Sequence, residues 1–167
     1  MSARMCRKSV ILTAFRDSSS ERLLKDIDNY ECIILSNDKV KDSEKLLDAI
    51  KRKRPDLILS FGQKPNIKNK AHIETTAKCG GEVIHTNFNC EKLQDLFEQN
   101  GMVSQISHNA GTSYCNQLYF NVMQEIFQKD LDTKMVFIHI PYVKNISDFD
   151  NYRKKIFDTV SNLVIGD

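Results

Sequence analysis

The chain has 167 residues, of which 41% are hydrophobic and 28% charged, a composition that supports one packed domain over residues 1–167. Lysine and arginine number 24 and aspartate and glutamate 22, so the formal net charge is +2. This near balance gives no electrostatic reason to expect a nucleic-acid or anionic-membrane partner. No apolar run approaches the ~20 residues that a bilayer-spanning helix needs, and we expect no secretory signal.

Five short segments are mostly apolar on both faces, which is typical of buried parallel strands: residues 9–15, 31–35, 56–61, 102–107 and 135–140. Helical patterns lie between them: a segment capped by Ser20 and ending near 27, one from Ser43 into the basic residues 51–54, then 90–100, 112–128, and a last helix from Ser147 to about 163. Residues 62–81 are weakly patterned and read as loop. The alternation predicts an α/β fold, a three-layer α/β/α domain with a doubly wound, mostly parallel sheet.

The cysteines are five, an odd number, and none forms a Cys-x-x-Cys pair. A disulfide framework or a zinc site is therefore not expected, and reduced thiols in a cytoplasmic setting are the default. No metal-ligand spacing or phosphate-binding glycine loop is present, so we expect no metal and no cofactor. Cys32 is expected in a strand core, whereas three cysteines are expected near the surface: Cys6, Cys79 and Cys90.

Cys115 follows a predicted strand end and a small turn, in the first turn of a predicted helix. Unpaired backbone N–H groups and the helix dipole stabilise a thiolate there, and the same groups can hold an oxyanion. A buried structural cysteine is the competing interpretation.

His139 lies near the end of an apolar strand, 24 residues after Cys115 (139 − 115). A helix of about 15 residues and a short loop would return the chain to the same sheet edge, where ligands bind in open α/β sheets. A Cys–His nucleophile pair is therefore geometrically sensible, with a hydrogen-bonded core histidine as the alternative. Glu74, taken alone, reads as a solvated surface residue. His72 and His85 are expected at the surface, and His108 in a solvent-facing turn or against substrate.

Together these segments resemble the pyroglutamyl peptidase I (pyrrolidone carboxyl peptidase) family. Residues 110–116, Ala-Gly-Thr-Ser-Tyr-Cys-Asn, match its AGTxxCN motif, and residues 137–142, Phe-Ile-His-Ile-Pro-Tyr, resemble its FIHIP segment. Gly-Gln at 62–63 follows a strand as in the family, residues 73–77 are similar to its xERVA stretch, and residues 12–15 to its TGF turn.

The resemblance implies a phosphorylase/hydrolase-like fold and a cytosolic, homotetrameric or homodimeric cysteine peptidase. Its substrate would be a peptide or small amide, and its reaction the removal of an N-terminal pyroglutamate. Cys115 would be the nucleophile, His139 the general base and acid, and Glu74 the residue that orients the imidazole. The residues expected at the substrate are Phe15, Gln63, Ser113 and Tyr142.

Serines stand near position 18 and at 113 where the family has aromatics around the pyroglutamate ring, and each lost ring contact costs ~1 kcal/mol or more. The loop at 62–66 lacks the family's glycines and arginine, and the shortened segment between Glu74 and Cys115 contains no arginine. Three interpretations follow: a pyroglutamyl peptidase, a thiol hydrolase of another small polar amide, or a non-catalytic ligand-binding or assembly member of the same fold.

Overall fold

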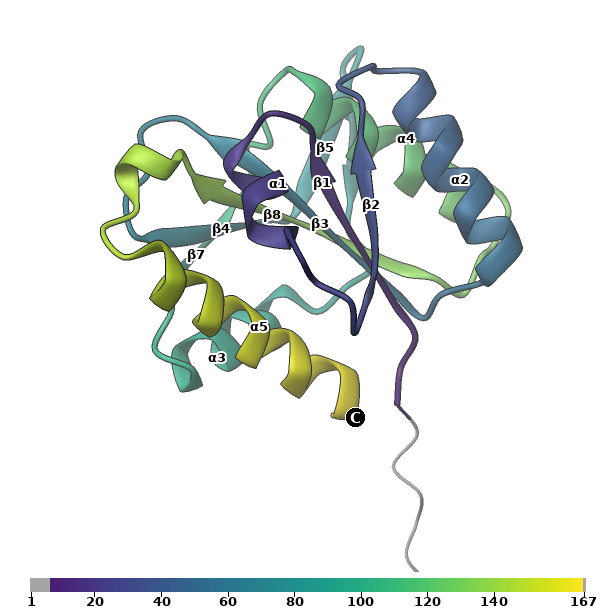
Figure 1. Ribbon diagram of the computed structural model, residues 1–167. Coiled ribbons are helices and arrows are strands. Elements are labelled where there is room, and N and C mark those ends of the chain that lie inside the picture. Colours follow the sequence, from purple (N-terminus) through teal and green to yellow (C-terminus); the bar gives the residue numbers. More distant parts are fainter. Residues whose placement is uncertain (1–6, 167) are drawn as a thin grey trace, which may run out of the picture.

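The computed structural model describes residues 7–166 and is built on a six-stranded sheet of order β2-β1-β3-β8-β4-β7 (Figure 1). The sheet strands are β1 (Val10–Phe15), β2 (Glu31–Leu35), β3 (Leu57–Lys64), β4 (Lys70–Glu74), β7 (Val103–Ser107) and β8 (Lys134–Pro141). A separate two-stranded hairpin is formed by β5 (Thr76–Cys79) and β6 (Glu82–His85).

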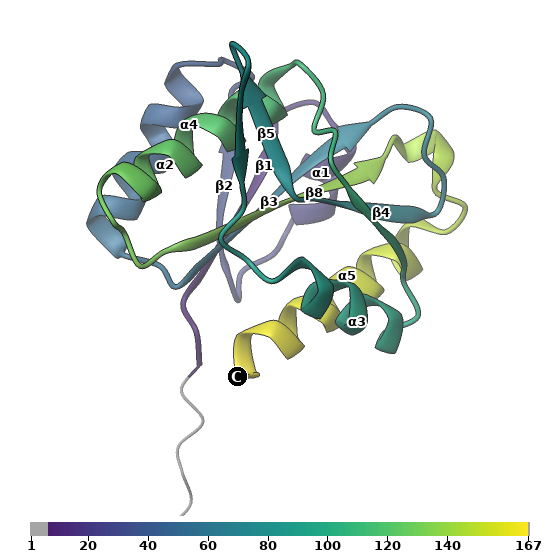
Figure 2. The same cartoon turned by 180° about the vertical axis from the view of Figure 1, so that it is seen from behind.

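Helices cover both faces of the sheet, giving the expected three layers (Figures 1 and 2). One face carries α2 (Lys41–Lys53) and α4 (Tyr114–Gln128), whose apolar side chains form one buried cluster with that face. The other face carries a second cluster, to which three helices contribute: α1 (Ser19–Leu24), α3 (Cys90–Gln99) and α5 (Phe149–Ile165). No helix within residues 7–166 is long and apolar enough to cross a membrane.

Strand direction in the sheet is mostly parallel, as predicted, with one reversal. β2, β1, β3 and β8 run parallel to one another, whereas β4 pairs antiparallel with β8, and β7 runs parallel to β4. In register, Gly62 of β3 lies opposite His139 of β8, and Glu74 of β4 lies opposite Phe137. Residues opposite each other share a face, so these positions all point toward α4.

The predicted loop over residues 62–81 is wrong. β3 continues through Lys64, and both β4 and β5 lie within that range. The segment lacks a hydrophobic signature because β4 alternates polar residues on the α4 face, where His72 and Glu74 are buried, with apolar residues on the other. Polar groups are buried here through mutual hydrogen bonding rather than through apolar packing.

Helix boundaries differ from expectation by one to three residues. Ser18, not Ser20, caps α1 by accepting from two backbone amides, and α1 ends at Leu24 rather than near 27. Asp148, not Ser147, caps α5. α2 begins at Lys41 rather than Ser43, because the Asp38 carboxylate accepts from the amides of residues 40 and 41. The basic run does end α2, in its last turn, as the charge pattern predicted.

The described cysteines are all free thiols: Cys32, Cys79, Cys90 and Cys115. Cys79 is exposed as predicted, and Cys32 is half-buried on an edge strand. The surface expectation for Cys90 is wrong, since its side chain packs into the cluster beneath α3 and α5. Cys6 lies outside the described residues.

Candidate active site

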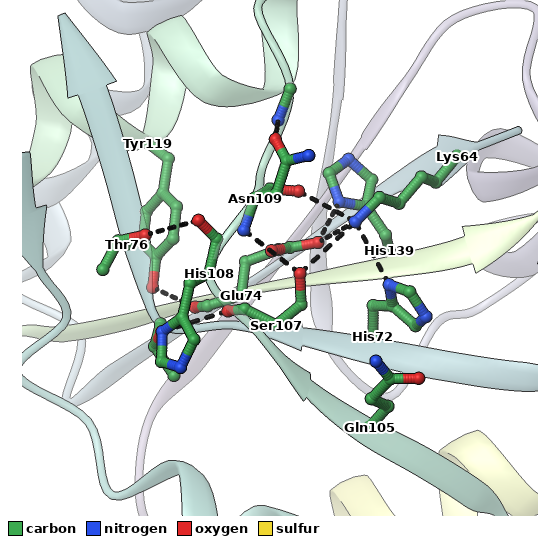
Figure 3. A network of polar contacts seen from close by, with 12 residues as sticks. Lys64, His72, Glu74, Thr76, Gln105, Ser107, His108, Asn109, Tyr119 and His139 are labelled. Atoms are coloured by element: carbon green, nitrogen blue, oxygen red, sulfur yellow. Dashed lines mark hydrogen bonds and ion pairs between the residues drawn. The ribbon is translucent and has the colours of Figure 1, made fainter.

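Glu74 and His139 form a buried pair in the centre of the sheet (Figure 3). Nδ1 of His139 donates to Oε1 of Glu74 at 2.9 Å, and the two side chains are 3% and 0% exposed. Glu74 is therefore not the solvated residue that its sequence context alone suggested. A carboxylate on Nδ1 fixes the ring and its tautomer, and leaves Nε2 as the nitrogen that can exchange a proton with a nucleophile.

Cys115 is the second residue of α4, and its side chain points down onto the sheet. A Cβ added to Gly62 would lie only 2.5 Å from Sγ of Cys115, so the sulfur rests on the bare backbone of β3. Because Gly62 is the register partner of His139, the thiol and the imidazole occupy neighbouring positions on one face of the sheet. The structure thus brings together the three residues that sequence reasoning singled out.

The route by which Cys115 reaches His139 is not the one predicted. We expected the strand at 102–107 to end at the same edge as the strand of His139, but β7 runs against β8 and Ser107 is level with Glu74. A loop over residues 108–113 instead carries the chain back over the sheet to the start of α4.

Two side chains of α4 connect its first turns to the end of β4 and to β5. Asn116 accepts from the backbone amide of Lys78 at 2.9 Å and donates to its carbonyl at 2.8 Å, as a strand partner would. The Tyr119 hydroxyl donates to the carbonyl of Glu74 at 2.7 Å. Asn116 belongs to the matched sequence motif, but its pairing with β5 was not foreseen because β5 itself was not.

Burial sets the resting protonation of the site. The expected stabilised thiolate is wrong for the resting site, because desolvation raises the pKa of the Cys115 thiol to about 12. Desolvation also lowers the pKa of His139, against the opposing effect of the Glu74 carboxylate. Burial alone would raise the pKa of Glu74, but hydrogen bonds from its neighbours, His139 foremost, outweigh it and lower the pKa. The resting site therefore holds a thiol, a neutral imidazole and a carboxylate.

Lys64 is a site residue that the sequence reasoning missed. Its Nζ donates to Oε1 of Glu74 at 2.9 Å and contacts Nδ1 of His72 at 3.1 Å (Figure 3). The surface expectation for His72 is wrong, since this side chain is buried beside the ammonium. A sequence signal for this role was available. If the strand is continued past residue 61, Gly62 and Lys64 lie two residues apart and point to the same face of the sheet.

The predicted substrate residues are not gathered in one pocket. Gln63 and Tyr142 line a hollow of about 970 Å³ beside α1, together with residues 16–19. Phe15 is buried and packs on Phe137, with ring centroids 6.3 Å apart. Ser113 is exposed at the N-terminus of α4.

The remaining histidines lie outside the hydrogen-bonded pair. His85 is exposed as predicted, and His108 is exposed in the loop before α4, with Nδ1 2.5 Å from the Thr75 hydroxyl. Among residues 7–166, no group of three or more His, Cys, Asp or Glu side chains is placed to hold a metal ion.

The family model of pyroglutamyl peptidase matches residues 65–154, which include Glu74, Cys115 and His139. The chain belongs to the pyroglutamyl peptidase family. It is 25% identical to the pyrrolidone-carboxylate peptidase of Brachyspira hyodysenteriae, over 72% of each chain. It is 28% identical to that of Fusobacterium nucleatum, over 81% of this chain and 79% of the relative.

The fold agrees with a solved member of the pyroglutamyl peptidase family. The crystal structure of pyroglutamyl peptidase I from Bacillus amyloliquefaciens superposes with a TM-score of 0.78 and 21% identity, covering 96% of both chains. The mostly parallel α/β/α architecture expected from the sequence is therefore confirmed. At this level of identity the likeness concerns the fold alone.

Proposed function

We propose that the protein is a cysteine peptidase that removes an N-terminal pyroglutamate from peptides. Cys115 is the nucleophile, His139 the general base and acid, and Glu74 the residue that orients the imidazole. The observation that carries the proposal is the buried Glu74–His139 hydrogen bond at 2.9 Å beside the sulfur of Cys115. Membership of a family of peptidases agrees with this reading of the site.

The first chemical step transfers the thiol proton of Cys115 to Nε2 of His139 while the sulfur attacks the carbonyl carbon of the substrate. Because burial opposes a free thiolate, proton transfer and attack are coupled, and the charge appears only when substrate is in place. Glu74 supports the resulting imidazolium through Nδ1, as an acid does in other triads.

The oxyanion that forms is placed at the start of α4. The first N–H groups of a helix have no intrahelical partner, and within the described chain the Ser113 side chain does not cap them. The amides in this first turn, that of Cys115 among them, are therefore placed to donate to developing negative charge.

Collapse of the tetrahedral intermediate breaks the C–N bond, and His139 gives its proton to the departing amine. The product left on the enzyme is an acyl-thioester on Cys115. His139, neutral again, takes a proton from water, which attacks the thioester carbonyl and frees pyroglutamate with the thiol restored.

The partner that this chemistry requires is a peptide or small amide with a blocked N-terminus. A cytoplasmic setting suits an enzyme that works through a reduced cysteine. Assembly into a homotetramer or homodimer rests on the sequence resemblance, and light scattering on the purified protein tests it.

The test is a fluorogenic pyroglutamyl-amide assay on the wild type, on Cys115→Ala, and on Cys90→Ala as a matched buried cysteine elsewhere in the core. We expect hydrolysis by the wild type, loss of at least about 10³-fold in Cys115→Ala, and near-normal rates in Cys90→Ala. Equal rates in wild type and Cys115→Ala refute the proposal.

A second candidate is the hydrolysis of another, more polar small amide by the same thiol. The exposed Ser113 just before α4 favours it, together with the charged residues Arg16 and Asp17, which line the hollow beside α1. A panel of amides that replaces pyroglutamyl by prolyl, glutaminyl or acetyl groups distinguishes the two. A preference for a non-pyroglutamyl amide that still depends on Cys115 selects the second function.

A further inference from the structure

Two hydrogen-bond donors, the Lys64 ammonium and the His139 imidazole, meet on one oxygen of Glu74. Nζ of Lys64 lies 2.9 Å from Oε1, the same atom that accepts from Nδ1 of His139 at 2.9 Å. The Lys64 side chain is only 19% exposed, so little water screens the pair. The carboxylate is thus shared between the His139 ring and the Lys64 side chain.

The same ammonium also holds the loop that leads to the nucleophile. It donates to the backbone carbonyl of Asn109 at 2.8 Å and lies 3.3 Å from the hydroxyl of Ser107. Asn109 precedes Cys115 by six residues (115 − 109), and its side chain accepts from the amide of Gly111 at 3.1 Å, within the turn that starts the motif. Lys64 therefore connects three strands and the loop across the site (Figure 3).

We infer that Lys64 is a positioning residue of the proposed active site, which fixes Glu74 against the loop carrying Cys115 and limits how strongly Glu74 stabilises the His139 imidazolium. The inference rests on the proposed function for its catalytic meaning. Its electrostatic part concerns the apo protein alone, and can be measured without any substrate.

Charged and titratable side chains face His139 from the elements packed against it. These are Lys64 from β3, His72 and Glu74 from β4, and Cys115 from α4. In the resting state the positive charge of Lys64 offsets the negative charge of Glu74, so little net negative charge acts on His139. Removing Lys64 leaves the carboxylate to His139 alone, which favours the protonated ring. The positive charge of Lys64 lowers the pKa of His139, so its removal should raise that pKa.

The experiment is an NMR titration of the His139 ring protons in wild type, Lys64→Met and Lys64→Gln, with His139→Gln used for assignment. Lys154→Met is the matched control, a lysine paired with a carboxylate on the exposed face of α5. We expect the His139 titration midpoint to rise by about one pH unit in both Lys64 variants. It should stay unchanged in Lys154→Met. An unshifted midpoint in both Lys64 variants overturns the electrostatic part.

A kinetic comparison tests the positioning part. Lys64→Gln keeps amide donors for the Asn109 carbonyl, whereas Lys64→Met keeps none, so kcat should fall by about tenfold or more in Lys64→Met and less in Lys64→Gln. KM should change little, since the ammonium points into the Glu74 cluster. Equal kcat in the two variants shows that the hydrogen bond from position 64 to the Asn109 carbonyl does not position the site, and overturns this part of the inference. Should Lys64→Met fail to fold, the Lys64→Gln titration still decides the electrostatic part.

The two proposals fail differently. If the protein lacks amidase activity but the His139 midpoint shifts, the proposed function falls and the coupling of Lys64 to Glu74 stands. If activity depends on Cys115 but neither midpoint nor kcat responds to position 64, the function stands and this inference falls.

Discussion

The sulfur of Cys115 rests on the backbone of Gly62, where even a single added methyl group would be 2.5 Å from Sγ. Glycine is needed here for space and not for a special backbone conformation, since Gly62 lies within β3. The close approach places the thiol beside the register partner of Gly62, His139. The identity of position 62 therefore sets how near the Cys115 thiol comes to the His139 imidazole.

Gly62→Ala is predicted to reduce activity far more than stability. The new methyl group would also lie 3.0 Å from the ring of Phe137, so the sulfur has to move away from the sheet. Overpacking of this kind costs about 1–3 kcal/mol of folding free energy. A displacement of about 1 Å in a reacting atom costs about 10²-fold in rate. Activity per folded molecule, with urea denaturation alongside, measures both effects.

Gly80→Ala is the matched control for this prediction. Gly80 lies in the β5–β6 turn with a positive φ of 55° and nothing within 4 Å of an added Cβ. Alanine there carries conformational strain without touching the site, so stability should fall slightly while activity per folded molecule stays at the wild-type level. A Gly62→Ala enzyme with normal kcat/KM would show that the sulfur is not seated as described.

The pH dependence of kcat/KM is predicted to be broad. In the proposed mechanism, activity requires a neutral His139 and a protonated Cys115 thiol. Burial lowers the pKa of His139 from its usual 6.5, so activity should be lost only as the pH falls below 6.5. Burial raises the pKa of the thiol to about 12, so no alkaline loss from this group is expected up to about pH 10. The measurement is a kcat/KM profile from pH 4.5 to 10.

The variant Glu74→Gln tests whether the acid limb of the kcat/KM profile reports the titration of His139. The Glu74 carboxylate raises the pKa of His139 against the effect of burial. Its neutral replacement should therefore move the acid limb to still lower pH, together with a loss of rate because the imidazolium is less well supported. An acid limb that moves upward in Glu74→Gln, or an alkaline limb near pH 8–9 in the wild type, contradicts this assignment of the two groups.

The sequence predicted the α/β architecture and named the residues of the candidate site, but it missed the strands that connect them. Cys115 and His139 stood in recognisable motifs at the interval that one helix and a loop require, and the structure places them side by side. Glu74 was identified only through its neighbours in the motif. Nothing in its local pattern marked it as a fully buried residue, because hydrophobic periodicity does not detect strands that bury functional polar groups.

The reversal of β4 and β7 could not be read from the sequence for a related reason. A short buried segment has the same apolar pattern whichever way it runs, so the pattern over 102–107 predicts a strand but not its direction. The contacts of Lys64 depend on that reversal, since β7 and the loop after it supply Ser107 and Asn109. Residues that meet across three strands are specified by topology, which local patterns do not encode.

The last prediction concerns the thiols, whose reactivity should run opposite to their proposed importance. Cys79 is exposed, whereas Cys115 is 8% exposed with a pKa raised by burial to about 12. At pH 7.5 iodoacetamide should therefore modify Cys79 first and Cys115 at least ~100-fold more slowly, because only the thiolate reacts.

A pyroglutamyl chloromethyl ketone, which brings its own carbonyl to the site, should reverse this order and alkylate Cys115 selectively. Peptide mapping by mass spectrometry, with Cys79→Ser as the control, follows both reactions. Rapid alkylation of Cys115 by iodoacetamide would show that the resting thiol is already ionised, and failure of the ketone to label it would refute its role as nucleophile toward pyroglutamyl substrates.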